Sequence, residues 1–388
     1  MKPHEFLRCS VLCYWLIGWS FLSAQQMPEP PQDQPALPFS IEKISPAYAY
    51  EHLQVFMLEK QEEITDEQYL PLQEAMQQKK VRIKETGTVN QLSIDNLSNQ
   101  PIYIQSGDIV KGGKQDRTLA YDMIIPPKAK NVPLNSFCVE QGRWRKRGQE
   151  AVDQFGSNEY MLSSKELRMA ARYHGNQSQV WNEVSATQRK LSLNLSKSST
   201  DTVIVSDSRS GSSLQLSLEN KDLKQAQEEM SRKLKPLLTQ HPQALGVAFA
   251  INGEIYGVEL YNQRALFEAM WPKLLQSMIT EALATSTQEQ CEMLNQAKVG
   301  QYLQETKKEL KATKEFALGK GASWKTEENQ QGYLRFTVED KKQGNWVHQS
   351  FMKRDNSQTV LPILPDSLRI DPARGQQLPA NLRNPRRN

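Results

Sequence analysis

Short apolar runs follow one another closely between His52 and Glu140, and several of them alternate with polar residues. The runs are Val55–Leu58, Val81–Lys84, Val89–Leu97, Pro101–Gln105, Leu119–Ile125 and Val132–Val139. Turn-forming sequences such as Asn99-Gln100-Pro101 separate them, and runs of this length and spacing are typical of strands. The stretch therefore predicts a mainly antiparallel β-sandwich or a partly open barrel.

The clearest local signal lies at Asn252-Gly253, between the runs Ala244–Ile251 and Glu254–Tyr261. Asn-Gly tolerates the positive φ angles of a two-residue turn, so these runs predict a β-hairpin. Apolar residues then recur every four positions and predict a helix with one buried face. They are Leu266, Met270, Leu274, Met278 and Ala282. Pro272 must either kink this helix or begin a new one.

Helical periodicity also marks Ser163–Tyr173, Ser178–Leu191 and Lys221–Leu238. Between the last two segments, Ser192–Asn220 is dominated by serine, and we interpret it as an insertion or flexible loop. A capping-box spacing of Ser286 and Glu289 predicts a further helix. Together these patterns predict an α+β fold in which the strands are followed by helices and a β-hairpin.

The first 24 residues have the pattern of a secretory signal. Lys2 and Arg8 flank the start, Val11–Leu22 is apolar, and Ser23-Ala24 supplies a small residue at a cleavage point. An apolar run of this length is too short to span a bilayer as a helix. We therefore expect export, to the periplasm or the medium, of a chain that begins near Gln25 and has no transmembrane segment.

The patterns divide the chain into five segments. These are a signal peptide (1–24), a Pro/Gln-rich linker (25–38), a core domain (39–285) that contains the serine-rich insertion (192–220), a C-terminal helical segment with a hairpin (286–364), and a disordered tail (365–388). The late hairpin is predicted because Leu334, Phe336 and Val338 alternate with polar residues and Trp346–Phe351 lies opposite them.

Charge and cysteine content narrow the function classes. The formal net charge is +4, and loss of Lys2, Arg8 and Glu5 with the signal leaves +3, which is too close to neutral to indicate a nucleic-acid partner. After removal of the signal only Cys138 and Cys291 remain. The chain is therefore not a disulfide-stapled scaffold.

A first candidate segment contains Lys114, Gln115, Asp116 and Arg117 beside Gly112-Gly113. A phosphate-binding P-loop is excluded, because five residues separate Gly107 from Gly113-Lys114 and Gln115 replaces the required hydroxyl residue. Glycines next to consecutive polar residues favour contact with an anion or another polar ligand. A solvated turn between strands is the alternative.

A second candidate segment runs from Cys138 to Trp144. A nucleophilic Cys138 needs a partner that lowers its pKa, and no histidine is near it in sequence, so a packed core thiol is the alternative. Glu140 and Arg143 are spaced to form an ion pair that braces the site. Trp144, among several Arg and Lys residues, offers a ring and cations for stacking on a base and holding phosphates. A basic run beside a core tryptophan is the alternative there.

Other chemistries find no motif in the sequence. The histidines are scattered, and neither Cys-x-x-Cys nor His-Glu-x-x-His occurs. Gly-x-Ser-x-Gly is also absent. The sequence therefore predicts no metal site and no cofactor, and it assigns no catalytic residue.

The two candidate segments together resemble the ARG and Rhodanese-Phosphatase-superfamily-associated protein family, in which ARG stands for ADP-ribosylglycohydrolase. The Gly-Lys-Gln-x-Arg and Cys-Val-Glu-x-Gly-Arg-Trp motifs carry the resemblance most sharply, and it extends from about His52 to Leu283. The family's own activity is unassigned. Its association with enzymes of ADP-ribose and NAD metabolism implies a nucleotide-like ligand for the residues Lys114, Gln115, Asp116, Arg117, Cys138, Glu140, Arg143 and Trp144.

Three functions remain open. The first is a polar-ligand-binding or sensing protein, which requires the two candidate segments to meet. The second is a non-catalytic structural or interaction protein of the cell envelope, with the polar groups of the motifs satisfied internally. The third is a hydrolase of a nucleotide-like substrate, which requires an activated nucleophile or a carboxyl group with a shifted pKa.

Overall fold

The turn at Asn252-Gly253 joins two strands at the centre of the largest sheet, as the sequence predicts. In the computed structural model Asn252 (φ 52°) and Gly253 (φ 79°) have the positive angles of a tight turn. The turn connects β13 (Ala244–Ile251) and β14 (Glu254–Tyr261), which pair in antiparallel register.

The structure describes residues 37–61, 67–156, 158, 160–161, 164–287, 291–318 and 321–354. The predicted signal peptide, the linker up to residue 36 and the predicted tail from residue 365 lie outside these residues. The mixed α+β class is confirmed, with antiparallel sheets, a nearly closed barrel-like sheet, several helices and C-terminal strands.

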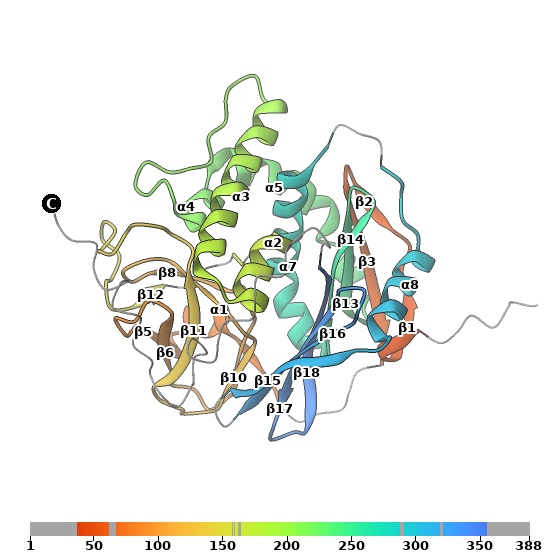
Figure 1. Ribbon diagram of the computed structural model, residues 1–388, viewed down its shortest axis with the longest axis horizontal. Coiled ribbons are helices and arrows are strands. Elements are labelled where there is room, and N and C mark those ends of the chain that lie inside the picture. The colour runs from red at the N-terminus through yellow and green to blue at the C-terminus, as the bar shows by residue number, and fades with distance from the viewer. Residues whose placement is uncertain are drawn as a thin grey trace, which may run out of the picture. The chain divides into compact units, whose positions relative to one another are not determined.

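The sheet that contains β13 and β14 has the strand order β1-β3-β13-β14-β18-β17-β16-β15, and β2 pairs with β3 (Figure 1). Its other strands are β1 (Ile41–Ile44), β2 (Tyr48–Tyr50), β3 (Leu53–Lys60), β15 (Lys311–Leu318), β16 (Ala322–Glu328), β17 (Tyr333–Asp340) and β18 (Asn345–Lys353). β17 and β18 form the late hairpin that the sequence predicts. Residues 322–353 therefore contribute three strands to the main sheet.

Helices cover both faces of this sheet. On one face lies α7 (Arg264–Thr285), which contains the predicted four-residue repeat and continues through Pro272. Met57 and Val247 pack on this side, in the cluster that also contains Trp271. On the other face, Phe56 and Leu58 pack in a cluster with residues of α8 (Gln296–Lys307). β3 is buried along its whole length because its alternate side chains enter these two clusters.

Several of the predicted N-terminal strands belong to a second, six-stranded sheet with the order β12-β8-β9-β11-β6-β5. Its strands are β5 (Val81–Glu85), β6 (Gln91–Asn96), β8 (Ile109–Gly112), β9 (Arg117–Leu119), β11 (Val132–Cys138) and β12 (Phe155–Gly156). An antiparallel bridge between Lys84 and Gln154 brings the two ends of the order together. The partly open barrel is therefore the correct alternative.

A small third sheet and a short helix lie beside these strands. The sheet contains β4 (Leu70–Pro71), β7 (Ile102–Ile104) and β10 (Met123–Ile125) in the order β10-β7-β4. The helix α1 (Leu72–Gln77) follows Pro71 directly, and its Leu72 and Ala75 are buried. The sequence predicts this helix among the strands, because Pro71 suits a helix start and Leu72, Ala75 and Met76 share one helical face.

The helical middle of the chain packs between the barrel-like sheet and α7 (Figure 1). It consists of α2 (Lys165–Arg168) continued by a π-helical segment (Met169–His174), α3 (Gln177–Lys197), α4 (Leu214–Leu218), α5 (Lys221–Leu234) and α6 (Leu237–Gln240). α3 contacts both β11 and α7, so it connects the two halves of the fold.

Two expectations about this region are wrong in detail. The serine-rich stretch is helical at both ends, because α3 continues to Lys197 and α4 buries Leu214, Leu216 and Leu218. The helix expected from Ser286 begins instead at Gln296, where Asn295 caps it. The Gln54 side chain pairs with the backbone N–H and C=O of Leu294 and holds that segment out of helical geometry.

Candidate ligand-binding site

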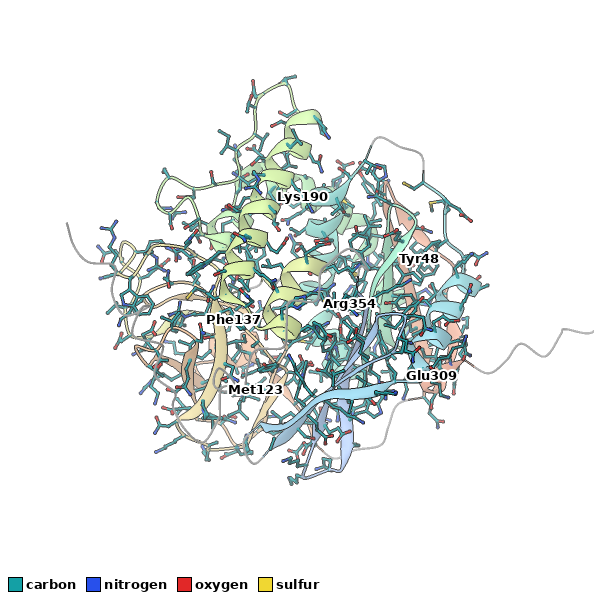
Figure 2. The ribbon with its side chains drawn as sticks, in the orientation of Figure 1. Tyr48, Met123, Phe137, Lys190, Glu309 and Arg354 are labelled. Atoms are coloured by element: carbon teal, nitrogen blue, oxygen red, sulfur yellow. The ribbon has the colours of Figure 1, made fainter. Side chains whose placement is uncertain are left out.

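The two candidate segments meet at one end of the barrel-like sheet. β11 pairs with β9 so that Cys138 lies opposite Arg117, and Phe137, labelled in Figure 2, precedes Cys138 at the end of β11. The Gln177 side chain donates to the Cys138 carbonyl (2.9 Å) and accepts from its backbone N–H (2.8 Å). The start of α3 therefore fixes the end of this strand.

The turn between β8 and β9 needs glycine. Gly113 has a φ of +54°, and a Cβ atom added there would lie 2.4 Å from the ring of Phe155. Any side chain at this position would collide with that ring and strain the backbone. The turn therefore packs directly against β12. The side chains that follow it, Gln115, Asp116 and Arg117, are buried.

Two carboxylates and two guanidinium groups form a buried network behind this turn. Arg147 donates to both oxygens of Asp116, at 2.7 and 3.0 Å. Arg143 donates to Glu140 through Nε (2.7 Å) and lies 2.7 Å from its other oxygen through Nη2. Glu140 also accepts the backbone N–H of Asp116 (3.1 Å), which links the two pairs.

The pKa values of the two carboxyl groups are shifted in opposite directions. Burial raises the pKa of Asp116 despite the hydrogen bonds from Arg147. It also opposes ionisation of Glu140, but the hydrogen bond from Arg143 and other donors leave the pKa of Glu140 below its ordinary value. Two-point pairing of this kind holds the segment 140–147 firmly to the β8–β9 turn.

Arg117 lies next to this network, and fewer of its hydrogen-bond donors have an acceptor. Its Nη1 donates to Gln115 Oε1 (3.1 Å) and to Cys138 Sγ (2.6 Å). In the described part of the chain, its Nε and Nη2 atoms have no hydrogen-bond acceptor. Glu85 Oε2 lies 3.8 Å from Nη2, beyond hydrogen-bond distance.

The outer face of the site is aromatic and basic. Trp144 is 43% exposed. The Lys114 ammonium lies 4.9 Å from the centre of its ring, and the Arg117 guanidinium carbon lies 5.5 Å from it. Arg145 and Lys146 are exposed next to it in the chain. This surface offers one flat apolar face bordered by cations.

The structure thus brings all eight candidate residues together but gives them different positions. Those that are buried are Gln115, Asp116, Arg117, Cys138, Glu140 and Arg143, whereas Lys114 is half-buried and Trp144 is exposed. Burial is the main reason that the pKa of Cys138 rises to about 11, so its sulfur is a thiol at neutral pH. A thiol is a poor nucleophile.

Sequence reasoning missed a second buried network, which connects the small sheets to the large one. His348 on β18 bonds through Nδ1 to Asp122 (2.5 Å) and through Nε2 to Glu259 (2.9 Å), and Arg168 donates to Glu259 (3.0 Å). Burial alone would lower the pKa of His348, but the two carboxylates raise it to about 9. Since 226 positions separate His348 from Asp122, no local pattern could have indicated this contact.

Neither a metal site nor a membrane helix is found in the residues that the structure describes. They contain no group of three or more His, Cys, Asp or Glu side chains arranged to hold a metal ion. No helix within them has the length and apolar character needed to cross a bilayer. A hollow of about 570 Å³ lies between α3 and residues 202–211, and none of the eight candidate residues lines it.

Comparison with known proteins gives one result that bears on identity. The sequence model of the ARG and Rhodanese-Phosphatase-superfamily-associated Protein domain matches residues 42–352. The chain belongs to this family. The matched region extends beyond the resemblance noted from the motifs and includes β15 to β18. No curated protein and no solved structure gave a match.

Proposed function

We propose that this member of the family is an exported protein that binds a small polar ligand at the face formed by Trp144 and Lys114. The exposed Trp144 ring supports this proposal most directly. It is presented on a segment that buried ion pairs hold in place, with an ammonium 4.9 Å from its centre. A large exposed aromatic side chain on a firmly braced segment is typical of a recognition surface.

The chemistry of this face fits a ligand that has a planar ring and an anionic group. Stacking of a base on an aromatic side chain contributes about 1–3 kcal/mol in single-strand binding proteins. The Lys114 ammonium adds positive charge at its border, where it lies over the Trp144 ring. The exposed Arg145 and Lys146 follow Trp144 in the chain. A nucleotide or ADP-ribose has both parts, so compounds of this class are the proposed ligands.

The buried residues support binding better than they support hydrolysis. The Cys138 thiol, with a pKa of about 11, lies against Arg117 and the Val89 carbonyl rather than against a general base. Asp116 and Glu140 are each occupied by an arginine. The buried ion pairs hold the segment that carries Trp144 in place. The exposed face of Trp144 and Lys114 contacts the ligand.

A thermal-shift titration of residues 25–388 with ADP-ribose, NAD and AMP tests the proposal. A ligand present at about one hundred times its Kd should stabilise the folded state by about 2.7 kcal/mol. The Trp144→Ala and Lys114→Ala variants should lose the shift. Lys353→Ala is the matched control, because the Lys353 ammonium also lies 4.9 Å from an aromatic ring, that of Tyr333.

Two results would overturn the proposal. One is the absence of any shift with these ligands, and the other is a shift that both variants retain in full. Export is tested separately by N-terminal sequencing of protein recovered from outside the cytoplasm. The chain should begin near Gln25, and a product that still carries residues 1–24 would contradict the proposed cleavage.

A further inference from the structure

We infer that Arg117 is the anchor for a phosphate group of the ligand, and that Trp144 covers this anchor until the ligand arrives. The inference rests on the proposed binding at this face and adds which chemical group enters it and by what movement. It follows from three observations. The buried Arg117 guanidinium has unpaired donors, the nearby Glu85 carboxylate does not hydrogen-bond to it, and the Trp144 indole lies over the guanidinium.

The unpaired donors come first. Arg117 is fully buried, and two of its nitrogen atoms, Nε and Nη2, find no acceptor among the described residues. Buried polar groups in folded proteins nearly always have a partner, because leaving one unpaired costs roughly 1–3 kcal/mol. Nε and Nη2 form one side of the guanidinium fork, the arrangement that takes two oxygens of a phosphate or carboxylate.

Glu85 is near this fork but does not fill it. Its Oε2 lies 3.8 Å from Nη2 and accepts the backbone N–H of Lys114 (3.3 Å), while Oε1 lies 3.4 Å from the N–H of Gly87. The carboxylate therefore contributes negative charge to Arg117 without a hydrogen bond. An incoming anion must compete with that charge, and it gains the unpaired donors by doing so.

Trp144 is free to move aside. The braces of the segment are Arg143 and Arg147, and the Trp144 side chain has no part in their ion pairs. Gly142, two positions before it, has a φ of +85°, and a Cβ atom added there would meet no atom within 4 Å. The indole can therefore leave Arg117 without breaking a buried ion pair, and its ring can then stack on the ring of the ligand.

The ligand class follows from this arrangement. A phosphate at Arg117 lies beside the Lys114 ammonium, which is already placed over the same indole. A ring attached to that phosphate reaches the exposed Trp144. The site therefore fits a nucleoside phosphate and discriminates against the nucleoside that lacks the phosphate.

The experiment compares AMP with adenosine by calorimetric titration of residues 25–388. We expect the wild-type protein to bind AMP at least about tenfold more tightly than adenosine. Arg117→Met should abolish this preference. Glu85→Gln removes the competing charge and keeps the shape, so AMP should bind about threefold more tightly or better. Circular dichroism and the melting temperature show whether each variant is folded.

The outcomes separate this inference from the proposed function. Equal affinity for AMP and adenosine, or a preference that survives in Arg117→Met, overturns the phosphate anchor and leaves ring binding intact. If Arg117→Met does not fold, Glu85→Gln decides, because unchanged or weaker AMP binding overturns the anchor. Binding of neither compound overturns both the proposed function and this inference. A ligand-induced change in tryptophan fluorescence that is retained in Trp144→Phe contradicts contact between the ligand and this indole.

Discussion

Glu281 provides the sharpest test of the buried electrostatics. It lies on α7 with no exposed surface. Burial first, and the charge of Glu166 second, raise the pKa of Glu281 from 4.5 to about 8. The folded protein therefore holds this carboxyl group in its protonated form at neutral pH.

The sign of the effect follows from comparison of the two states. Between pH 4.5 and about 8 the carboxyl group is ionised in the unfolded chain and protonated in the folded one. Unfolding then releases a proton, so the free energy of unfolding falls by up to about 1.4 kcal/mol for each pH unit in this window. The stability is fully present below pH 4.5 and is lost by about pH 8, for a total of roughly 5 kcal/mol at most.

The Glu281→Gln variant removes the titration and keeps the shape of the protonated side chain. Its free energy of unfolding relative to wild type should increase steadily from pH 5 to pH 8 and level off above that. Urea unfolding followed by circular dichroism at unit pH steps measures this difference. Groups such as His348 titrate in both proteins, so their effect cancels in the comparison.

An exposed glutamate serves as the control. Glu228→Gln changes a solvent-facing residue of α5, so its unfolding curves should run parallel to wild type across the same pH range. If Glu281→Gln also runs parallel to wild type, Glu281 is ionised in the folded protein, and the reasoning from its burial is refuted.

Three further predictions concern the candidate site. Arg147→Ala should lower the free energy of unfolding by about 3 kcal/mol or more in urea unfolding, because Asp116 is left buried without its partner; a loss below 1 kcal/mol would show that water reaches the carboxylate. Gly113→Ala should lower the melting temperature, because the added Cβ meets the ring beside it, and an unchanged value would contradict the tight turn. A thiol reagent should modify Cys291 before Cys138 in the native protein, and modification at equal rates would contradict the burial of Cys138.

Local patterns were sufficient wherever neighbouring residues determine the structure. The Asn252-Gly253 turn, the repeat in α7 and the alternation in β17 each depend on contacts within a few positions of the chain. The serine-rich stretch misled the prediction because composition alone indicates a loop. The buried faces of α3 and α4 outweigh that composition, and serine side chains such as Ser213 cap a helix there.

The candidate site shows the same division. The motifs marked a turn with glycines and the end of a strand, both visible in the sequence, and only the ligand-binding hypothesis required these two segments to meet. Burial was not visible. In the sequence, Arg147 is one member of a basic run that is expected to face solvent. In the structure its side chain is buried and donates to Asp116, 31 positions earlier. The histidine network depends on pairing between distant strands, which no single segment of sequence encodes.

The position of β18 has a consequence for the order in which this protein can assemble. The strand lies between β14 and β17, inside the large sheet, although it is the last strand of the described chain. A ribosome must therefore finish nearly the whole polypeptide before the middle of the sheet can close, and His348 reaches Asp122 only at that stage. Contacts over such sequence separations form slowly. A chain that stops before residue 345 would expose two unpaired strand edges, where other unfinished copies can attach.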